Sequence, residues 1–323
     1  MRKNKLTAKA RKHIRLAKFF IISLIFVGIA ASFGLVGFNY INNQNFKETF
    51  YCVGSLKVNN KIRVIQISDL HNASFGDDNK VLIDRVEKLK PDLIILTGDC
   101  IDSNSQSEKN AVSLCSKLVE IAPLYYIYGN NEVEKYYDTL LSQNSLDKKF
   151  GFTDENRDPQ KLLEITDSFT EKLQEAGVKV LKNSFDTITV GTTNIDVYGV
   201  LTSNPSAFWS YAGASFDEYI YSNSNNLKIT AIHEPNIFKE FSPNTWGDVT
   251  LAGHTHGGIA KLPVLGPIYT HDGGLLPERE GHFVYGRYEV QGRPLIVTSG
   301  LDNSSFFRIN NQPEIVIVDI NKF

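Results

Sequence analysis

Residues 63–100 read RVIQISDLHNASFGDDNKVLIDRVEKLKPDLIILTGDC, and this stretch determines the fold class. Its two ends, Arg63–Ser68 and Asp92–Thr97, are short apolar runs typical of buried strands. Between them, four apolar residues recur at helical spacing: Val81, Leu82, Val86 and Leu89. A second helical pattern leads to a third run, Leu124–Tyr128. The order β-α-β-α-β predicts a mostly parallel sheet covered by helices.

The second half of the chain is rich in strand patterns. Glu134–Ala176 is polar and predicted to be helical, with a loop around Gly151–Pro159. After it come eight further predicted strands: Lys179–Leu181, Thr187–Val190, Asn194–Gly199, Leu227–Ile232, Val249–Ala252, Val284–Val290, Leu295–Thr298 and Ile315–Ile320. Two sheets packed face to face, with helices outside, would use all of these strands.

Side chains that can bind metals follow five of the predicted strands. They stand in Asp69-Leu70-His71, Gly98-Asp99-Cys100-Ile101-Asp102, Gly129-Asn130-Asn131-Glu132, His233 and Gly253-His254-Thr255-His256-Gly257-Gly258. Any one of these segments alone is explained by a turn or a helix cap. Taken together, and at the strand ends where α/β sheets place their sites, they predict a metal centre.

The types of the candidate ligands indicate the ions. Imidazole, carboxylate and amide groups without a thiolate suit Mn, Fe or Zn better than Ca or Mg. Two divalent ions bring four positive charges, whereas Asp69 and Asp99 supply two negative ones. The surplus charge would attract an anion such as phosphate and activate a water molecule.

This series of motifs resembles the calcineurin-like metallophosphoesterases over about residues 60–323. The Gly-His-Thr-His-Gly-Gly form, the Pro263–Gly266 loop and the tail from Arg293 resemble its membrane-anchored or exported bacterial branch. The resemblance implies a four-layer α/β/β/α sandwich. It also implies two ions that share Asp99 and a nucleophilic hydroxide. One ion would be held by Asp69, His71, Asp99 and His256, and the other by Asp99, Asn130, His233 and His254.

One position departs from the family pattern, which reads Gly-Asn-His-Glu. Here Asn131 replaces the histidine that is thought to protonate the leaving group. An amide donates hydrogen bonds but has no proton to transfer near neutral pH. Asp102, which resembles the carboxylate partner of that histidine, would then meet an amide. We expect a slow enzyme, or one that prefers leaving groups needing little protonation. His271 and His282 are alternative proton donors, although ordinary loop positions also explain them.

The N-terminus is predicted to be a signal anchor. Eight Lys and Arg residues and no acid lie within residues 1–18, the predicted basic cytoplasmic tail. Residues 19–38 are uncharged and long enough to span a bilayer as a helix. A signal peptide cut near Ala30-Ala31-Ser32 is the alternative. Residues 39–60 are predicted to be a polar stalk, and residues 61–323 the catalytic domain. Positive charge stays inside, so we expect a single-pass protein of the cell membrane with that domain on the extracytoplasmic side.

These features predict a phosphate-ester hydrolase, either a phosphodiesterase or a phosphatase. Its substrate could be lipid-linked, cell-wall-linked or a nucleotide. A net charge of −2 gives no indication of a nucleic-acid partner. The alternative prompted by Asn131 is a metal-binding pseudoenzyme that binds phosphorylated ligands. A serine hydrolase lacks support, because no Gly-X-Ser-X-Gly motif is present.

Three further features allow two interpretations each. Five aromatic residues before His233 predict either a local subcore or an apolar surface for substrate or membrane: Trp209, Tyr211, Phe216, Tyr219 and Tyr221. Arg308 could contact phosphate or form a surface salt bridge. The three cysteines, Cys52, Cys100 and Cys115, are expected to be free thiols, although an exported domain could pair two of them.

Overall fold

The computed structural model describes residues 8–138, 167–201, 215–240, 247–290, 292–303 and 308–323. The chain divides into two units, residues 1–42 and 43–323. The described part of the first unit, residues 8–42, lies in helix α1, which runs from Ala8 to Asn43. Within it, Arg15–Asn43 is long and apolar enough to cross a membrane. The same length and composition also fit a signal sequence.

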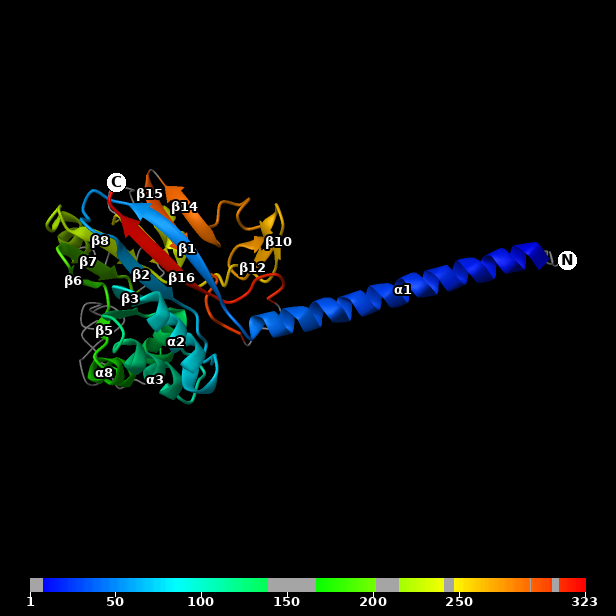
Figure 1. Cartoon of the computed structure of the whole chain (residues 1–323), viewed down its shortest axis with the longest axis horizontal. Coiled ribbons are helices and arrows are strands. Elements are labelled where there is room, and N and C mark those ends of the chain that lie inside the picture. The colour runs from blue at the N-terminus through cyan, green and yellow to red at the C-terminus, as the bar shows by residue number, and fades with distance from the viewer. Residues whose placement is uncertain (1–7, 139–166, 202–214, 241–246, 291, 304–307) are drawn as a thin grey trace, which may run out of the picture. The chain divides into compact units, whose positions relative to one another are not determined.

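The second unit contains two six-stranded mixed sheets (Figure 1). The first has the order β1-β16-β2-β3-β4-β5. Its strands are β1 (Lys47–Gly54), β2 (Ile62–Ile67), β3 (Leu93–Leu96), β4 (Leu124–Ile127), β5 (Lys179–Leu181) and β16 (Glu314–Asn321). The parallel order β2-β3-β4 confirms the β-α-β-α-β prediction.

The second sheet has the order β14-β15-β9-β8-β7-β6. Its strands are β6 (Ser184–Val190), β7 (Thr193–Gly199), β8 (Leu227–Ala231), β9 (Val249–Ala252), β14 (Gly286–Val290) and β15 (Arg293–Val297). Two short hairpins leave this sheet after β9. They pair β10 (Lys261–Leu262) with β11 (Gly266–Pro267), and β12 (Tyr269–Thr270) with β13 (Gly274–Leu275).

Alternation of side chains along the strands builds the layers. In β2, Val64 packs into the cluster between the sheets, whereas Ile65 packs against the helices on the other face. Those helices are α2 (Lys80–Leu89), α3 (Lys109–Leu118) and α8 (Ser168–Glu175). The outer face of the second sheet is covered by helical residues 215–221 and the 3₁₀ helix η3 (Pro235–Glu240). The predicted four-layer α/β/β/α order is confirmed.

The predicted stalk over residues 39–60 is wrong in its middle. Lys47–Gly54 form β1, which pairs in parallel with the C-terminal strand β16 along its whole length. The pairing partner lies more than 260 residues away in the sequence, so no local pattern identifies it. The predicted helices over Glu134–Ala176 are described only at their ends, where residues 134–138 form a π-helical turn and α8 begins at Ser168.

Candidate metal centre

The ends of five strands bring all seven predicted ligands together. Asp69 and His71 follow β2, Asp99 follows β3, Asn130 begins the short helix α4 (Asn130–Val133) after β4, His233 follows β8, and His254 and His256 follow β9. Five of these residues have positive φ angles: Asp69, His71, Asp99, His254 and His256. Such conformations cost free energy in residues other than glycine, and they cluster at functional sites.

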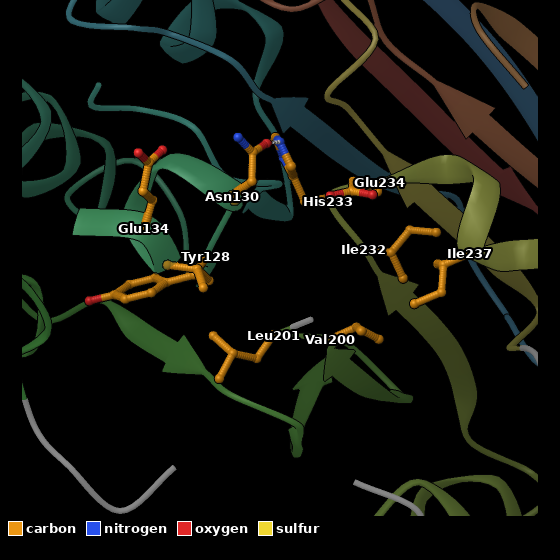
Figure 2. A pocket seen from close by; sticks show the side chains of 11 residues that line it. Tyr128, Asn130, Glu134, Val200, Leu201, Ile232, His233, Glu234 and Ile237 are labelled. Atoms are coloured by element: carbon orange, nitrogen blue, oxygen red, sulfur yellow. Dashed lines mark hydrogen bonds between the residues drawn. The ribbon is translucent and has the colours of Figure 1, made fainter. Parts of the chain in front are cut away.

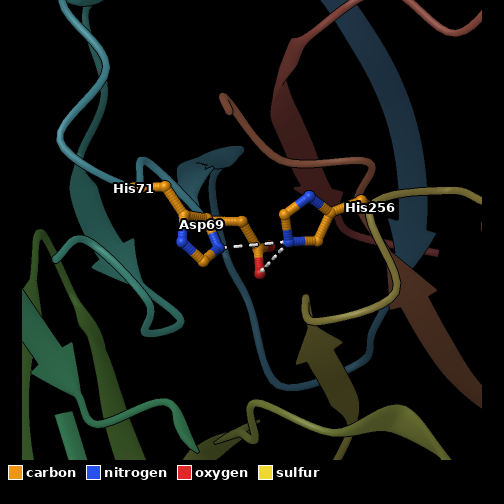
Figure 3. Close-up of side chains that lie close together, drawn as sticks. All are labelled: Asp69, His71 and His256. Atoms are coloured by element: carbon orange, nitrogen blue, oxygen red, sulfur yellow. Dashed lines mark hydrogen bonds and ion pairs between the residues drawn. The ribbon is translucent and has the colours of Figure 1, made fainter. Parts of the chain in front are cut away.

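Asp69, His71 and His256 form the first group (Figure 3). The Nε2 atoms of His71 and His256 lie 3.2 Å apart. Nε2 of His256 lies 3.6 Å from Oδ1 of Asp69. One ligand atom from each residue therefore faces a common point.

Asp99, His233 and His254 form the second group. Oδ1 of Asn130 completes it, lying 3.0 Å from Nε2 of His233 and 2.9 Å from Nδ1 of His254. Oδ2 of Asp99 lies 3.3 Å from Nε2 of His233 and 3.7 Å from Nε2 of His71. A single oxygen of Asp99 thus faces both groups, as a bridging ligand must.

Hydrogen bonds on the outer side of the imidazoles determine which nitrogen carries a proton. Nδ1 of His71 donates to Asp102 at 2.7 Å, and Nδ1 of His233 donates to the carbonyl of Thr97 at 2.7 Å. Nε2 of His254 donates to Asp272. In the neutral ring, the nitrogen that faces the site then presents a lone pair.

These contacts are what a pair of divalent cations requires. Inner nitrogens face each other at 3.2 Å in His71 with His256 and in His233 with His254, so two neutral rings point their lone pairs at one another and need either a shared proton or a cation between them. A cation between them satisfies both lone pairs. The donor set of four imidazoles, two carboxylates and one amide oxygen therefore fits two divalent metal ions.

Carboxylates dominate the electrostatics of the centre. Burial alone would lower the pKa of His233, but the charges of Asp99 and Asp69 outweigh it and raise that pKa to about 10. Burial likewise opposes protonation of His71, whereas the hydrogen bond to Asp102 and the charge of Asp99 raise its pKa to about 9. Without metals both imidazoles hold protons at neutral pH, so metal binding must release them.

Glu132 holds two of the ligand-bearing loops in place. Its buried carboxylate accepts the backbone N–H groups of Asp99, Cys100 and Gly129, and the hydroxyl of Tyr126. A Cβ on Gly129 would lie 2.1 Å from Oδ1 of Asp99. Glu132 and Gly129 thus allow the loops after β3 and β4 to approach each other closely.

Asn131 lies beside the shared carboxylate. Its Nδ2 donates to Oδ2 of Asp99 at 2.7 Å, and its Oδ1 accepts the N–H of Ser103 at 3.0 Å. Asp102, expected to meet the amide of Asn131, instead contacts His71 and the side-chain amide of Asn72. The reason is that the ring of His71 donates a hydrogen bond to Asp102 and carries the opposite charge when it is protonated. The hydrogen bond and the charge both lower the pKa of Asp102.

Three carboxylates that the sequence did not assign support the ligands. Besides Glu132, these are Asp272, whose pKa the hydrogen bond from His254 lowers to about 2, and Asp302, whose Oδ2 lies 3.6 Å from Nδ1 of His256. Asp302 follows β15, so its strand-end position was a usable signal. Asp272 lies at the tip of the β12–β13 hairpin, where no pattern predicts it.

The structure bears on two of the open interpretations. Arg308 is not a surface residue, because its guanidinium is buried and donates to the carbonyls of Ser299, Asp302 and Asn311. It lines a cavity together with His254 and His256, so contact with phosphate stays a prediction. Phe216 and Tyr219 are buried and pack in a local subcore. Tyr221 is exposed. Trp209 and Tyr211 lie outside the described residues.

The structure also describes the three cysteines, His271 and His282. The cysteines are free, with Cys100 and Cys115 buried and Cys52 exposed. The side chain of His271 is fully exposed. His282 is partly buried, and its backbone N–H donates to Pro277.

Two cavities adjoin the centre. One, of about 290 Å³, has Asn130 and His233 at one side and the apolar residues Val200, Leu201 and Ile232 at the other (Figure 2). The second, of about 600 Å³, extends from His254 and His256 to Ile259 and Tyr269. Asn130 lines both cavities, so both open onto the second candidate metal group.

The fold and the paired metal groups define a metal-dependent phosphoesterase, and comparison with known proteins gives the same class. The family model of the calcineurin-like phosphoesterases matches residues 62–258. The chain belongs to this family and is a hydrolase.

Relatives cover most of this chain. It is 27% identical over 260 residues to the uncharacterized metallophosphoesterase YkuE of Bacillus subtilis, covering 79% of this chain and 77% of that protein. It is 23% identical over 262 residues to the phosphodiesterase YaeI of Escherichia coli, covering 80% and 82%. Among solved structures, the phosphopantetheinyl hydrolase PptH of Mycobacterium tuberculosis is similar, with a TM-score of 0.41, 14% identity and coverage of 74% and 89%.

Proposed function

We propose that this protein is a membrane-anchored hydrolase of phosphate monoesters or diesters that works with two divalent ions, Mn, Fe or Zn. One ion would be held by Asp69, His71, Asp99 and His256, and the other by Asp99, Asn130, His233 and His254. When bound, the ions would activate a water molecule and neutralise the phosphoryl oxygens. The observation that carries the proposal is the pairing of inner ring nitrogens at 3.2 Å while the outer nitrogens donate to fixed acceptors.

The protein's own residues would orient the reacting groups. The Asp102 carboxylate holds the His71 ring in one tautomer, and Glu132 holds the loop that carries Asp99. The amide of Asn131 would donate a hydrogen bond to a phosphoryl oxygen. It cannot supply a proton, so the leaving group would depart as an anion or take a proton from solvent.

Two features support a membrane anchor: the apolar helix is long enough to span a bilayer, and basic residues precede it. Residues 1–18 would stay in the cytoplasm, residues 19–38 would span the membrane, and the domain from residue 43 would face outward. The substrate would be a phosphoester at that face, lipid-linked or cell-wall-linked. The exported bacterial branch of the family fits this arrangement.

Turnover of p-nitrophenyl phosphate and its bis ester by the full chain with Mn²⁺ tests the proposal. We expect metal-dependent turnover of at least one ester, and a loss of at least about 100-fold in Asp99→Asn. The matched control is Asp84→Asn, which removes an exposed ion pair with Lys80 and should leave turnover unchanged. Tight metal binding without turnover of either ester would contradict the proposal and favour the pseudoenzyme that Asn131 suggests.

A further inference from the structure

The two hairpins after β9 carry apolar side chains that point into solvent. Leu262, Val264 and Leu265 lie on or between β10 and β11, with Val264 fully exposed. Tyr269 and Leu275 lie on β12 and β13, and Leu275 is 67% exposed. We call these five residues the hairpin rim. Backbone hydrogen bonds from Ile268 to Ala260 and from Leu276 to Ile268 tie the two hairpins together, and Figure 1 shows them outside the two main sheets.

The rim is apolar where turns are normally polar. The tip of the first hairpin reads Leu262-Pro263-Val264-Leu265-Gly266, although Asn, Asp and Gly are the usual residues of such tips. Val264 has a φ of 70°, a left-handed conformation that is strained for a β-branched residue.

Charge is absent from the outer surface of the first hairpin. Lys261 is the only charged residue between Ile259 and Thr270, and its Nζ is buried against the ring of Tyr285. A surface that is apolar and uncharged suits the interior of a lipid layer, which excludes charged groups. A small polar phosphoester would make no favourable contact with such a surface.

The rim is connected to the candidate metal centre. Tyr269 lines the cavity of about 600 Å³ that reaches His254 and His256. Asp272, at the tip of the second hairpin, accepts the hydrogen bond from Nε2 of His254. A molecule whose apolar part rests on the rim can therefore place its phosphate at the metal ligands.

As the membrane anchor proposed above, α1 would hold the domain near a lipid surface. Helix α1 ends at Asn43 and β1 begins at Lys47, so three residues join the membrane-spanning candidate to the first sheet. Three extended residues span only about 10 Å. A domain tethered this closely stays within reach of the bilayer.

We propose that the hairpin rim contacts the lipid bilayer and that the substrate is a phosphoester with a lipid chain. This inference rests on the proposed function and specifies its substrate class. In the reaction, the oxygen of water forms a new bond to phosphorus, the bond to the leaving oxygen breaks, and the proton of water passes to solvent.

Two diesters that differ only in their apolar part test this inference. Methyl p-nitrophenyl phosphate and hexadecyl p-nitrophenyl phosphate release the same p-nitrophenolate anion, so their leaving-group chemistry is equal. The full chain is reconstituted in phosphatidylcholine vesicles and kcat/KM is measured for both esters with Mn²⁺. The double variant Val264→Asn and Leu275→Ser removes the exposed apolar groups of both hairpins, and Asn tolerates positive φ.

We expect the variant to lower the hexadecyl-to-methyl ratio of kcat/KM at least about tenfold, because it removes the surface that receives the lipid chain. The matched control is Leu56→Ser with Val81→Asn, which exchanges the same residue types at exposed positions outside both cavities. It should keep the wild-type ratio. Simple enrichment of the hexadecyl ester in the vesicle acts on all three proteins alike, because all three keep α1.

An unchanged ratio in the rim variant would overturn the inference and assign the rim to another partner, such as a protein. An equal fall in the control variant would also overturn it. Turnover of the methyl ester reports separately on folding and metal loading. If the wild type turned over neither these diesters nor p-nitrophenyl phosphate, the proposed function itself would fail, which is a different result from an unchanged ratio. Turnover of p-nitrophenyl phosphate alone would leave the proposed function standing and overturn this inference.

Discussion

The outer hydrogen bond of each histidine determines what its inner nitrogen can do. Asp102, the carbonyl of Thr97 and Asp272 fix the tautomers of three rings, so that their lone pairs face the centre. Asn131 does not hold a histidine ring. It contacts the shared carboxylate of Asp99 through an N–H that cannot be transferred.

Asn131→His should restore a proton donor next to Asp99. We expect kcat to rise about tenfold or more on an alkyl phosphate ester, which needs protonation of its leaving group. On a p-nitrophenyl ester, which does not, the change should stay within about twofold. Steady-state kinetics on both esters checks this. Equal effects on the two esters would show that the missing acid does not limit the reaction.

The loops that follow individual strands carry the metal ligands. One strand, β1, was not predicted from the sequence. Strand β1 is joined to the domain by Glu314 on β16, whose buried carboxylate accepts the hydroxyls of Thr49 and Tyr285 and the N–H of Ser299. Ser299 lies two residues after the end of β15 and one residue before Gly300, where an added Cβ would lie 2.6 Å from Cβ of Asp69. The edge strand and the site are therefore linked through one carboxylate.

Glu314→Ala should leave several buried donors without an acceptor. We expect the free energy of unfolding to fall by about 3–5 kcal/mol. Glu289→Ala removes an exposed ion pair with Arg287 on β14 and should cost less than about 1 kcal/mol. Urea unfolding of the full chain in detergent measures both. Similar losses in the two variants would contradict the role given to Glu314.

The predictability of these elements follows from the range of their interactions. The ends of β2, β3, β4, β8 and β9 were predicted because each strand is a local apolar run followed by polar residues. Strand β1 was missed because its residues are only partly buried and its partner is the C-terminal strand. Asp272 was missed for the same reason, since its contact with His254 depends on how a short hairpin folds back.

For the molecule as a whole, the sequence predicted the layers and the grouping of ligands, because parallel strands bring their carboxyl ends to one edge. It could not predict the contact of Asp272 with His254 or the apolar hairpin rim. Those depend on the tertiary placement of loops. The exposed helix α1 agrees with an anchor by length and composition.

The charge asymmetry around α1 predicts the side of the membrane. Residues 1–18 carry eight Lys and Arg residues and no acid, so we expect them in the cytoplasm and the domain outside. A protease added to intact cells should digest the domain, and a cytoplasmic marker protein should survive as the control. Complete protection of the domain until the cells are permeabilised would reverse the orientation.

Metal content is the most direct test of the paired centre. The full chain is purified, equilibrated with Mn²⁺, freed of excess metal and measured by mass spectrometry of the elements. We expect about two ions per chain in the wild type, and about one or fewer in Asp99→Asn, because that carboxylate faces both groups. A wild-type chain that binds no transition metal, or an Asp99→Asn chain that still binds two, would contradict the shared-carboxylate centre.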